Sequence, residues 1–157
     1  MLQVVVVMLN RLRLTVFFLG ILLLGNAYAA EKPVAPDSID GAVTVSAEEV
    51  IKLIFSNPHI VLIDSRKNTE YLKGHIEGAI NILNTVLSQQ GLEKHVPNKS
   101  AALLFYCNGI RCMRSSDSVK KALGWGYTNL FWFRGGWDEW MDKRFPVITG
   151  EYLYPKQ

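Results

Sequence analysis

The sequence predicts an α/β fold in which a parallel sheet of five strands carries helices on both faces. Predicted strands alternate with predicted helices along the chain. Two of the strands, at 59–63 and 101–106, are continuous apolar runs apart from His59. Runs of this length without polar alternation are typical of strands that are buried on both faces. Folds of this kind bind ligands at the carboxyl ends of their strands, so functional residues are expected there.

The chain begins with the pattern of a signal peptide over residues 1–29. Two arginines precede an apolar run at 14–24, and small residues follow, so a cut is expected after Ala29 or Ala30. The competing interpretation is a membrane anchor, but a spanning helix needs about 20 apolar residues, which would bury the arginines. A start at Met8 would give a cleaner leader. The sequence therefore predicts export, to the periplasm, without a stable membrane anchor after cleavage.

The low net charge of the chain argues against nucleic acid as a partner. The whole chain carries a formal charge of +3, and because both leader arginines would leave with the leader, the remainder carries only +1. A domain that binds nucleic acid usually shows a basic field, which is missing from this composition. Nucleic acid is therefore not an expected partner.

The elements follow one another from residue 42 onwards. Residues 30–41 contain two prolines and small polar residues, and they predict a flexible N-terminal segment. Ser46 and Glu49 form a capping-box pattern that begins the first helix, and Asn57-Pro58 ends it. The predicted strands are 42–45, 59–63, 79–82, 101–106 and 129–133, and the later helices are placed around 69–73, within 85–95, at 114–123 and after the Gly135-Gly136 turn.

Cys107 is the strongest functional feature. It directly follows the apolar strand at 101–106 and precedes the helix that begins at Arg114. Loop amides and a helix N-terminus converge at such a position and favour an anion. The thiol is therefore predicted to have a lowered pKa and to be nucleophilic. Arg111 and Arg114 add positive charge that can attract a small anionic sulfur donor.

The second cysteine, Cys112, lies only five positions after Cys107. A disulfide that closes so short a loop would add little stability, which favours a reactive pair over a structural bridge. Cys112 can act as a resolving thiol towards an oxidised or persulfidated Cys107, or it can be a small residue at the helix entry. Two cysteines alone do not supply a tetrahedral zinc site, so no metal is expected.

Several segments in register resemble the rhodanese-like family. The segments are 61–66 ending in Asp64-Ser65-Arg66, 70–81 with Gly74-His75-Ile76-Glu77-Gly78-Ala79, Phe105-Tyr106-Cys107, 126–130, Gly135-Gly136, Trp140 and Pro146-Val147. The resemblance covers a domain at 42–150 and leaves 151–157 as a C-terminal tail. It implies the five-stranded parallel sheet and sulfur transfer through a persulfide on Cys107.

The loop after Cys107 departs from the family pattern Cys-x-x-Gly-x-Arg-Ser. Gly109 and Arg111 come one residue early, and Cys112 stands where the arginine is expected. Phosphatase-like relatives need Cys-x5-Arg, and that position is Met113 here. The predicted substrate-binding residues of the loop are Asn108, Gly109, Ile110, Arg111, Cys112 and Arg114. Asp64, Arg66, Glu70 and His75 are interpreted as structural residues rather than catalytic ones.

The resemblance implies a rhodanese-type sulfurtransferase that needs no cofactor. Cys107 would take the outer sulfur of a donor such as thiosulfate, and a thiol, cyanide or a partner protein would accept it. The alternative is a module that uses the fold without turnover, either for redox chemistry through the Cys107–Cys112 pair or for protein binding, because fold alone does not determine function.

Overall fold

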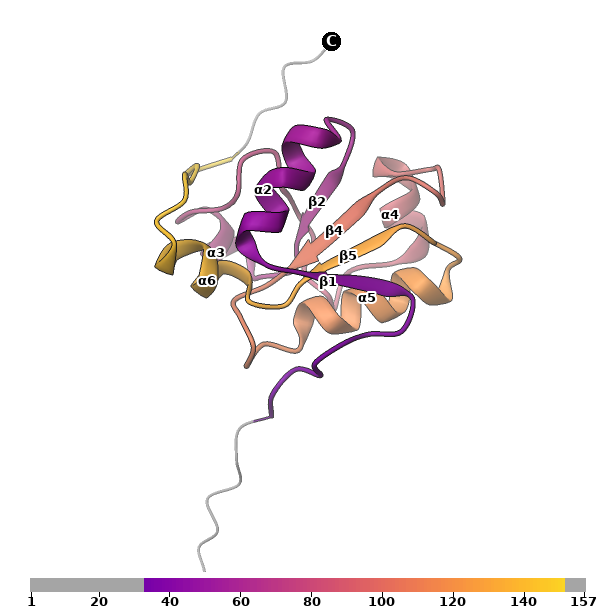
Figure 1. Cartoon of the computed structure of the whole chain (residues 1–157). Helices are drawn as coiled ribbons and strands as arrows, with labels where there is room; N and C mark the ends of the chain where they lie inside the picture. Colours follow the sequence, from indigo (N-terminus) through magenta and orange to yellow (C-terminus); the bar gives the residue numbers. More distant parts are fainter. Residues whose placement is uncertain (1–32, 152–157) are drawn as a thin grey trace, which may run out of the picture. The chain divides into compact units, whose positions relative to one another are not determined.

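The computed structural model describes residues 33–151. The predicted leader at 1–29 and residues 152–157 of the predicted tail lie outside the described residues. Within the described range the chain forms one sheet of five parallel strands in the order β1-β5-β4-β2-β3 (Figure 1). The strands are β1 (Ala42–Val45), β2 (Val61–Asp64), β3 (Ile80–Asn81), β4 (Leu103–Tyr106) and β5 (Leu130–Phe133).

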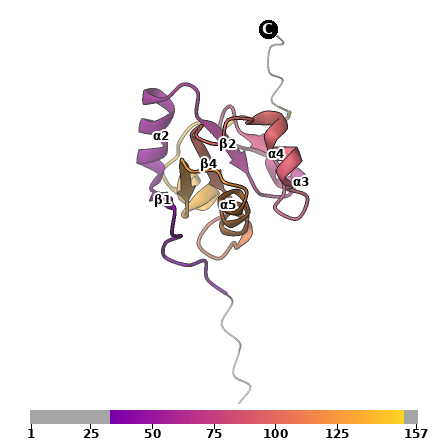
Figure 2. The same ribbon diagram turned by 90° about the vertical axis from the view of Figure 1, so that its right-hand side faces the viewer.

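Helices cover both faces of this sheet, as the two views in Figures 1 and 2 show. The helices are α2 (Ala47–Ser56), α3 (Asn68–Tyr71), α4 (Gln89–His95), α5 (Arg114–Gly124) and α6 (Gly136–Asp142). One core cluster joins α4 and α5 to the sheet, and a second joins α2, α3 and α6 to the opposite face. The predicted α/β fold with a covered parallel sheet is therefore confirmed.

Strand β4 lies in the interior of the sheet and connects the two cores. Its four residues are fully buried. Leu103 and Phe105 belong to the core under α4 and α5, whereas Leu104 and Tyr106 belong to the core under α2, α3 and α6. Burial on both faces explains why the sequence of this strand is apolar without alternation.

The capping box at the start of α2 is confirmed. Ser46 Oγ accepts a hydrogen bond from the Glu49 amide at 3.3 Å, and Glu49 Oε2 accepts one from the Ser46 amide at 2.7 Å. These bonds satisfy amide groups that a helix N-terminus leaves without intrahelical partners. The helix ends at Ser56, directly before Asn57-Pro58.

Residues 33–41, which belong to the segment predicted to be flexible, make contacts with the domain. Ala35 and Ile39 are buried in the core beside α5. The Ala35 amide donates to the carbonyl of Ile110 at 2.7 Å, which joins this segment to the loop after β4. Arg134 donates to the carbonyls of Pro36 at 2.7 Å and Ala35 at 2.9 Å. These bonds give polar backbone groups of the segment partners in the domain.

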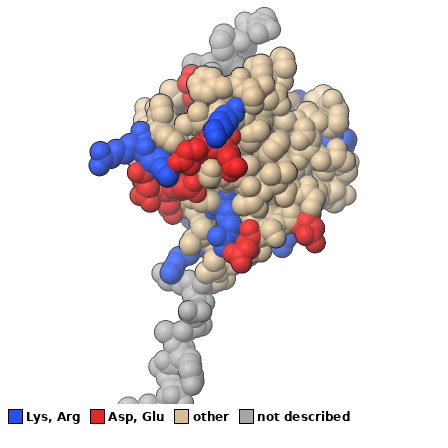
Figure 3. Space-filling view, viewed as in Figure 1, with Lys and Arg blue, Asp and Glu red and all other residues tan. Residues whose placement is uncertain are grey.

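Charged side chains of both signs share the face that Figure 3 shows. The main group of acidic side chains on this face lies over α6 and the start of α2 with basic side chains beside it, and other acidic side chains lie apart from it. Lys143 and Glu48 connect the two elements through an ion pair of 2.6 Å.

None of the helices within residues 33–151 is long and apolar enough to cross a membrane.

Candidate active site

The loop at 107–113 connects the end of β4 to the start of α5 and is fixed by backbone hydrogen bonds. The Trp137 amide donates to the Cys107 carbonyl at 2.8 Å, and the Asp138 amide donates to the Asn108 carbonyl at 2.7 Å. The start of α6 therefore holds the first two residues of the loop. Within the loop, the Cys112 amide donates to the Gly109 carbonyl at 2.8 Å.

The Cys107 side chain lies beneath this loop. The residue is 1% exposed, and its Sγ lies 3.1 Å from the Cys112 carbonyl oxygen and 3.1 Å from Ser115 Oγ. Trp132 Nε1 donates to Ser115 Oγ at 3.0 Å, which leaves the hydroxyl hydrogen of Ser115 available to the sulfur. The sequence analysis did not single out Ser115 or Trp132, because the contacts arise from the packing of α5 on β5.

The pKa of Cys107 corrects the prediction made from its position in the chain. Its thiol has a raised pKa because of the neighbouring Cys112 side chain and because of burial, although the hydroxyl and amide of Ser115 act in the opposite direction. Conversely, the neighbouring Cys107 thiol and hydrogen bonds from Arg114 lower the pKa of Cys112 to about 5, against the effect of burial. The positive charge of Arg114 thus lies against the sulfur of Cys112 rather than against that of Cys107.

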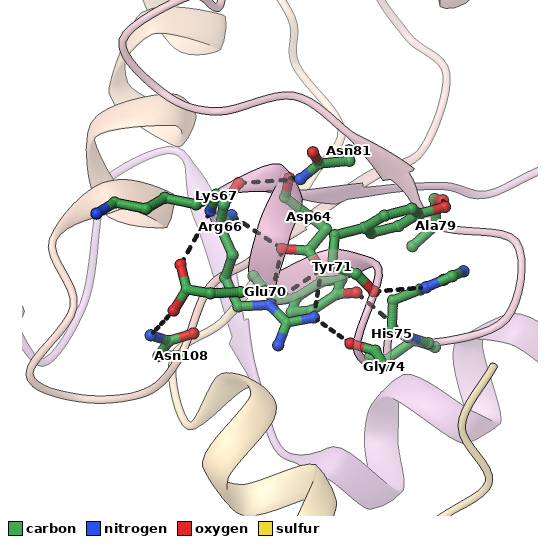
Figure 4. A network of polar contacts seen from close by, with 12 residues as sticks. Asp64, Arg66, Lys67, Glu70, Tyr71, Gly74, His75, Ala79, Asn81 and Asn108 are labelled. Atoms are coloured by element: carbon green, nitrogen blue, oxygen red, sulfur yellow. Dashed lines mark hydrogen bonds and ion pairs between the residues drawn. The ribbon is translucent and has the colours of Figure 1, made fainter. Parts of the chain in front are cut away.

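Arg114 and Glu70 hold the outer side of the loop. Arg114 Nε donates to Cys112 Sγ at 3.2 Å, and Arg114 Nη1 lies 2.9 Å from Glu70 Oε2. Glu70 also accepts hydrogen bonds from Asn108 Nδ2 at 2.8 Å and from the Lys67 amide at 3.0 Å, as Figure 4 shows. Glu70, predicted to be structural, thus connects α3 to the loop.

The acid stability of the protein is expected to depend on Glu70. Burial alone would raise its pKa, but hydrogen bonds from Asn108 and Arg114 lower it to about 2. A lowered carboxyl pKa stabilises the fold above the ordinary value of 4.5, and this stabilisation is lost as the pH falls towards 2. We expect Glu70→Gln to lower the free energy of unfolding by about 1 kcal/mol at pH 7. The free energy of unfolding of this variant should also fall less steeply in acid than that of the wild type. Urea denaturation from pH 7 to pH 2 measures both effects, and parallel profiles for the two proteins would contradict the assignment.

Asp64 and Arg66 form a buried ion pair at the end of β2. Arg66 Nη2 lies 2.6 Å from Asp64 Oδ2 and donates to the Gly74 carbonyl at 2.7 Å (Figure 4). The two side chains are 0% and 2% exposed, and the guanidinium lies 4.3 Å from the centre of a Trp137 ring. Since every one of these contacts is internal, both residues support the fold.

His75 is also held inside the fold. Its Nδ1 lies 3.0 Å from the Tyr71 carbonyl oxygen, and its ring stacks on the Tyr71 ring with centroids 3.7 Å apart. The backbone of His75 pairs with Ile148. Its Nε2 has no hydrogen-bond partner among the described residues. These contacts of His75 are thus with α3 and the C-terminal segment rather than with Cys107.

A pocket with a volume of about 360 Å³ lies over the loop. It is lined by Asn108, Gly109, Arg111, Cys112, Met113, Arg114 and Asp138. Five of the six predicted substrate-binding residues therefore line the same pocket. The sixth, Ile110, is not among the lining residues, and its carbonyl accepts a hydrogen bond from the Ala35 amide. Asp138 was not predicted, because only the packing of α6 against the loop brings it there. Within residues 33–151, no group of three or more His, Cys, Asp or Glu side chains is placed to hold a metal.

Gly136 allows α6 to approach the loop. It has a φ of 56°, and a Cβ at this position would lie 2.3 Å from the Cys107 carbonyl oxygen. We expect Gly136→Ala to destabilise the protein by about 2 kcal/mol or more and to impair the site. The matched control is Gly124→Ala at the end of α5, where, apart from its chain neighbours and the backbone of its own helix, no described atom lies within 4 Å of the added carbon. Thermal denaturation that affected both variants equally would contradict this role for Gly136.

Comparisons with known proteins agree with the fold. The rhodanese-like domain matches residues 46–143. The thiosulfate:glutathione sulfurtransferase of Saccharomyces cerevisiae is 28% identical over 95 residues, which cover 54% of this chain and 67% of the relative. The tRNA uridine(34) hydroxylase of Buchnera aphidicola is 33% identical over 98 residues, which cover 59% of this chain but 30% of that enzyme.

The solved structures include the BH2092 protein of Bacillus halodurans. It superposes with a TM-score of 0.61 at 21% identity, covering 69% of this chain and 77% of that one. At this identity the likeness concerns the fold, which has the same architecture as the sheet and helices described above. The domain match extends over more than half of the chain and includes the loop after β4. The chain therefore belongs to the rhodanese-like domain family.

Proposed function

We propose that the protein is a sulfurtransferase that carries a sulfane sulfur on Cys107. The observation that carries this proposal is the place of Cys107 at the carboxyl end of β4, with its sulfur 3.1 Å from the Ser115 hydroxyl. The Cys112 side chain and burial raise the pKa of this thiol, and the Ser115 hydroxyl and amide act against that rise because they favour a negative charge on the sulfur. A persulfide is also an anion, and hydrogen bonds from the Ser115 hydroxyl and amide would stabilise it in the same way.

The reaction has two half-steps that need no cofactor. A protein thiolate attacks the outer sulfur of the donor, the sulfur–sulfur bond of the donor breaks, and sulfite leaves if the donor is thiosulfate. An acceptor nucleophile then attacks the outer sulfur of the Cys107 persulfide and releases the Cys107 thiolate. Cyanide, a small thiol or a cysteine of a partner protein can serve as the acceptor.

The charges at the pocket support an anionic donor of small size. Arg111 and Arg114 line the pocket and can attract an anion. Glu70 forms an ion pair with Arg114, whereas Arg111, the other arginine that lines the pocket, forms no ion pair within residues 33–151. The name of the yeast relative, a thiosulfate:glutathione sulfurtransferase, agrees with thiosulfate as a donor to try first.

Turnover of the reduced protein tests the proposal. Thiosulfate and cyanide are supplied together, and thiocyanate is measured over time. A small-molecule persulfide is then tried in place of thiosulfate, with cyanide still present. We expect thiocyanate above the uncatalysed rate with at least one of the two donors. No catalysis with either donor would contradict a sulfurtransferase.

A second function is favoured by the proximity of the two cysteines. Cys107 Sγ lies 3.1 Å from the carbonyl oxygen of Cys112, and both residues are free thiols in the structure. A redox or protein-binding module would switch between these thiols and a disulfide without transferring sulfur. Reversible formation of the disulfide under mild oxidation, combined with no turnover of any sulfur donor, would favour this function over sulfur transfer.

We also propose that the protein is exported to the periplasm. The support is the leader pattern at 1–29, with two arginines before an apolar run and small residues at the expected cut. N-terminal sequencing of the protein from cell fractions tests this. A new N-terminus at Ala30 or Glu31 in the periplasmic fraction is the expected result, and an uncut chain in the cytosol would contradict it.

A further inference from the structure

The two cysteines differ in their access to the pocket. Cys107 is 1% exposed and lies beneath the loop, against Ser115 and the backbone of Cys112. Cys112 is partly exposed and lines the pocket itself, together with Arg111 and Asp138. In this arrangement of the loop, a donor molecule in the pocket meets the sulfur of Cys112 before that of Cys107.

The chain also provides a cation for the sulfur of Cys112. Arg114 Nε donates to Cys112 Sγ at 3.2 Å. The arginine is in turn oriented by Glu70 at 2.9 Å, and Glu70 is fixed by Asn108 at 2.8 Å. This series of contacts holds a positive charge against Cys112, whereas the Cys107 sulfur has the uncharged Ser115 hydroxyl and a carbonyl oxygen as neighbours.

The pKa values of Cys107 and Cys112 shift in opposite directions. The Cys107 thiol and hydrogen bonds from Arg114 lower the pKa of Cys112, which favours the thiolate at this sulfur. The Cys112 side chain and burial raise the pKa of Cys107, which favours the protonated thiol there. The thiolate is the nucleophilic form, and here it is the sulfur that faces the pocket.

From the access and the contacts, we propose that Cys112 receives the sulfur from the donor and passes it to Cys107. This inference rests on the proposed function and assigns to the second cysteine a role in loading the first. Cys112 is then a catalytic residue that touches the reacting atoms, and Arg114 is a positioning residue that holds its thiolate.

The transfer balances without an oxidant or a reductant. The Cys112 thiolate attacks the sulfane sulfur, and the donor's remaining part leaves with the electron pair of the broken sulfur–sulfur bond. The Cys107 proton then moves to the outer sulfur of the Cys112 persulfide. The Cys107 thiolate attacks that sulfur, and Cys112 leaves as a thiolate. A thiol of low pKa leaves readily in such an exchange.

Digestion with trypsin places the two cysteines on different peptides, because Arg111 lies between them in the sequence. Cleavage after Lys99, Arg111 and Arg114 places Cys107 on the peptide 100–111 and Cys112 on the peptide 112–114. The reduced protein is mixed rapidly with thiosulfate or with a small-molecule persulfide, alkylated at successive times and digested. Mass spectrometry of both peptides then shows which cysteine gains a sulfur atom first.

Three forms of the protein are compared. In the wild type, we expect sulfur on Cys112 before Cys107. In Cys107→Ser, it should remain on Cys112. In Cys112→Ser, loading of Cys107 should slow by about 10-fold or more, because the accessible thiolate is lost. Circular dichroism and the melting temperature of each variant separate these effects from unfolding.

The remaining outcomes contradict the inference in distinguishable ways. Sulfur that reaches Cys107 first, with Cys112→Ser loading at the wild-type rate, would overturn the relay and leave the proposed function intact. Formation of a Cys107–Cys112 disulfide with release of hydrosulfide would replace the relay by a resolving role for Cys112. Sulfur on neither peptide with either donor would overturn both the relay and the proposed function.

Discussion

Replacement of Cys107 by serine is expected to reduce sulfur transfer to below about one thousandth of the wild-type rate, because the acceptor takes its sulfur from the Cys107 persulfide and the variant has no sulfur at that position. The effect should be on the catalytic rate, since Arg111 and Arg114, which can attract the donor, remain in place. Thiocyanate formation from cyanide and the donor that the wild type uses measures the loss.

Serine is a suitable replacement because Cys107 makes polar contacts that a hydroxyl can keep. The Cys107 sulfur lies against the Ser115 hydroxyl and the Cys112 carbonyl oxygen, both at 3.1 Å. The variant should therefore fold, and its circular dichroism should match that of the wild type. A folded Cys107→Ser protein with substantial turnover would remove Cys107 from the mechanism.

The largest loss of stability is expected for Arg66→Ala. This change leaves the carboxylate of Asp64, which is 0% exposed, without its charged partner. Removing one member of a buried ion pair costs about 3–5 kcal/mol, because the remaining charge is neither paired nor hydrated. The loss of the contacts to Gly74 and to the Trp137 ring adds to this cost. Urea denaturation at pH 7 measures the change in the free energy of unfolding.

A double variant separates the charge from the packing. In Asp64→Asn/Arg66→Met, neither side chain carries a charge, and the methionine keeps part of the volume. We expect this protein to be more stable than Arg66→Ala, since no unpaired charge remains inside it. If the double variant were the less stable of the two, the ion pair would not be the source of the effect.

The main elements of the fold are readable from local sequence because each depends on neighbouring residues. The capping box of Ser46 and Glu49 lies within one helical turn, and the apolar runs of β2 and β4 reflect burial on both faces. The strand predicted at 59–63 is shifted to Val61–Asp64, because the pairing of Asp64 with Tyr106 and Asn81 sets its end. That register depends on neighbouring strands, which local patterns do not contain.

The place of Cys107 directly after β4 follows from the sequence, but its burial beneath the loop does not. The end of an apolar strand was enough to identify Cys107, and the loop residues that line the pocket follow it directly. The burial of Cys107 and the contact of Arg114 with Cys112 depend on how the loop closes, which spacing does not determine. Arg134 donates a hydrogen bond to the Pro36 carbonyl, 98 positions earlier in the chain. Local sequence patterns therefore do not predict the packing of residues 33–41.

The most direct test of the account is the location of the sulfur in the loaded protein. The reduced wild type is incubated with a donor in the absence of an acceptor, alkylated, and cut with trypsin, and the peptide 100–111 is weighed before and after treatment with cyanide. The account predicts one additional sulfur atom on this peptide, at Cys107, and its removal by cyanide as thiocyanate. Turnover of the donor without any sulfur on this peptide would contradict a persulfide on Cys107.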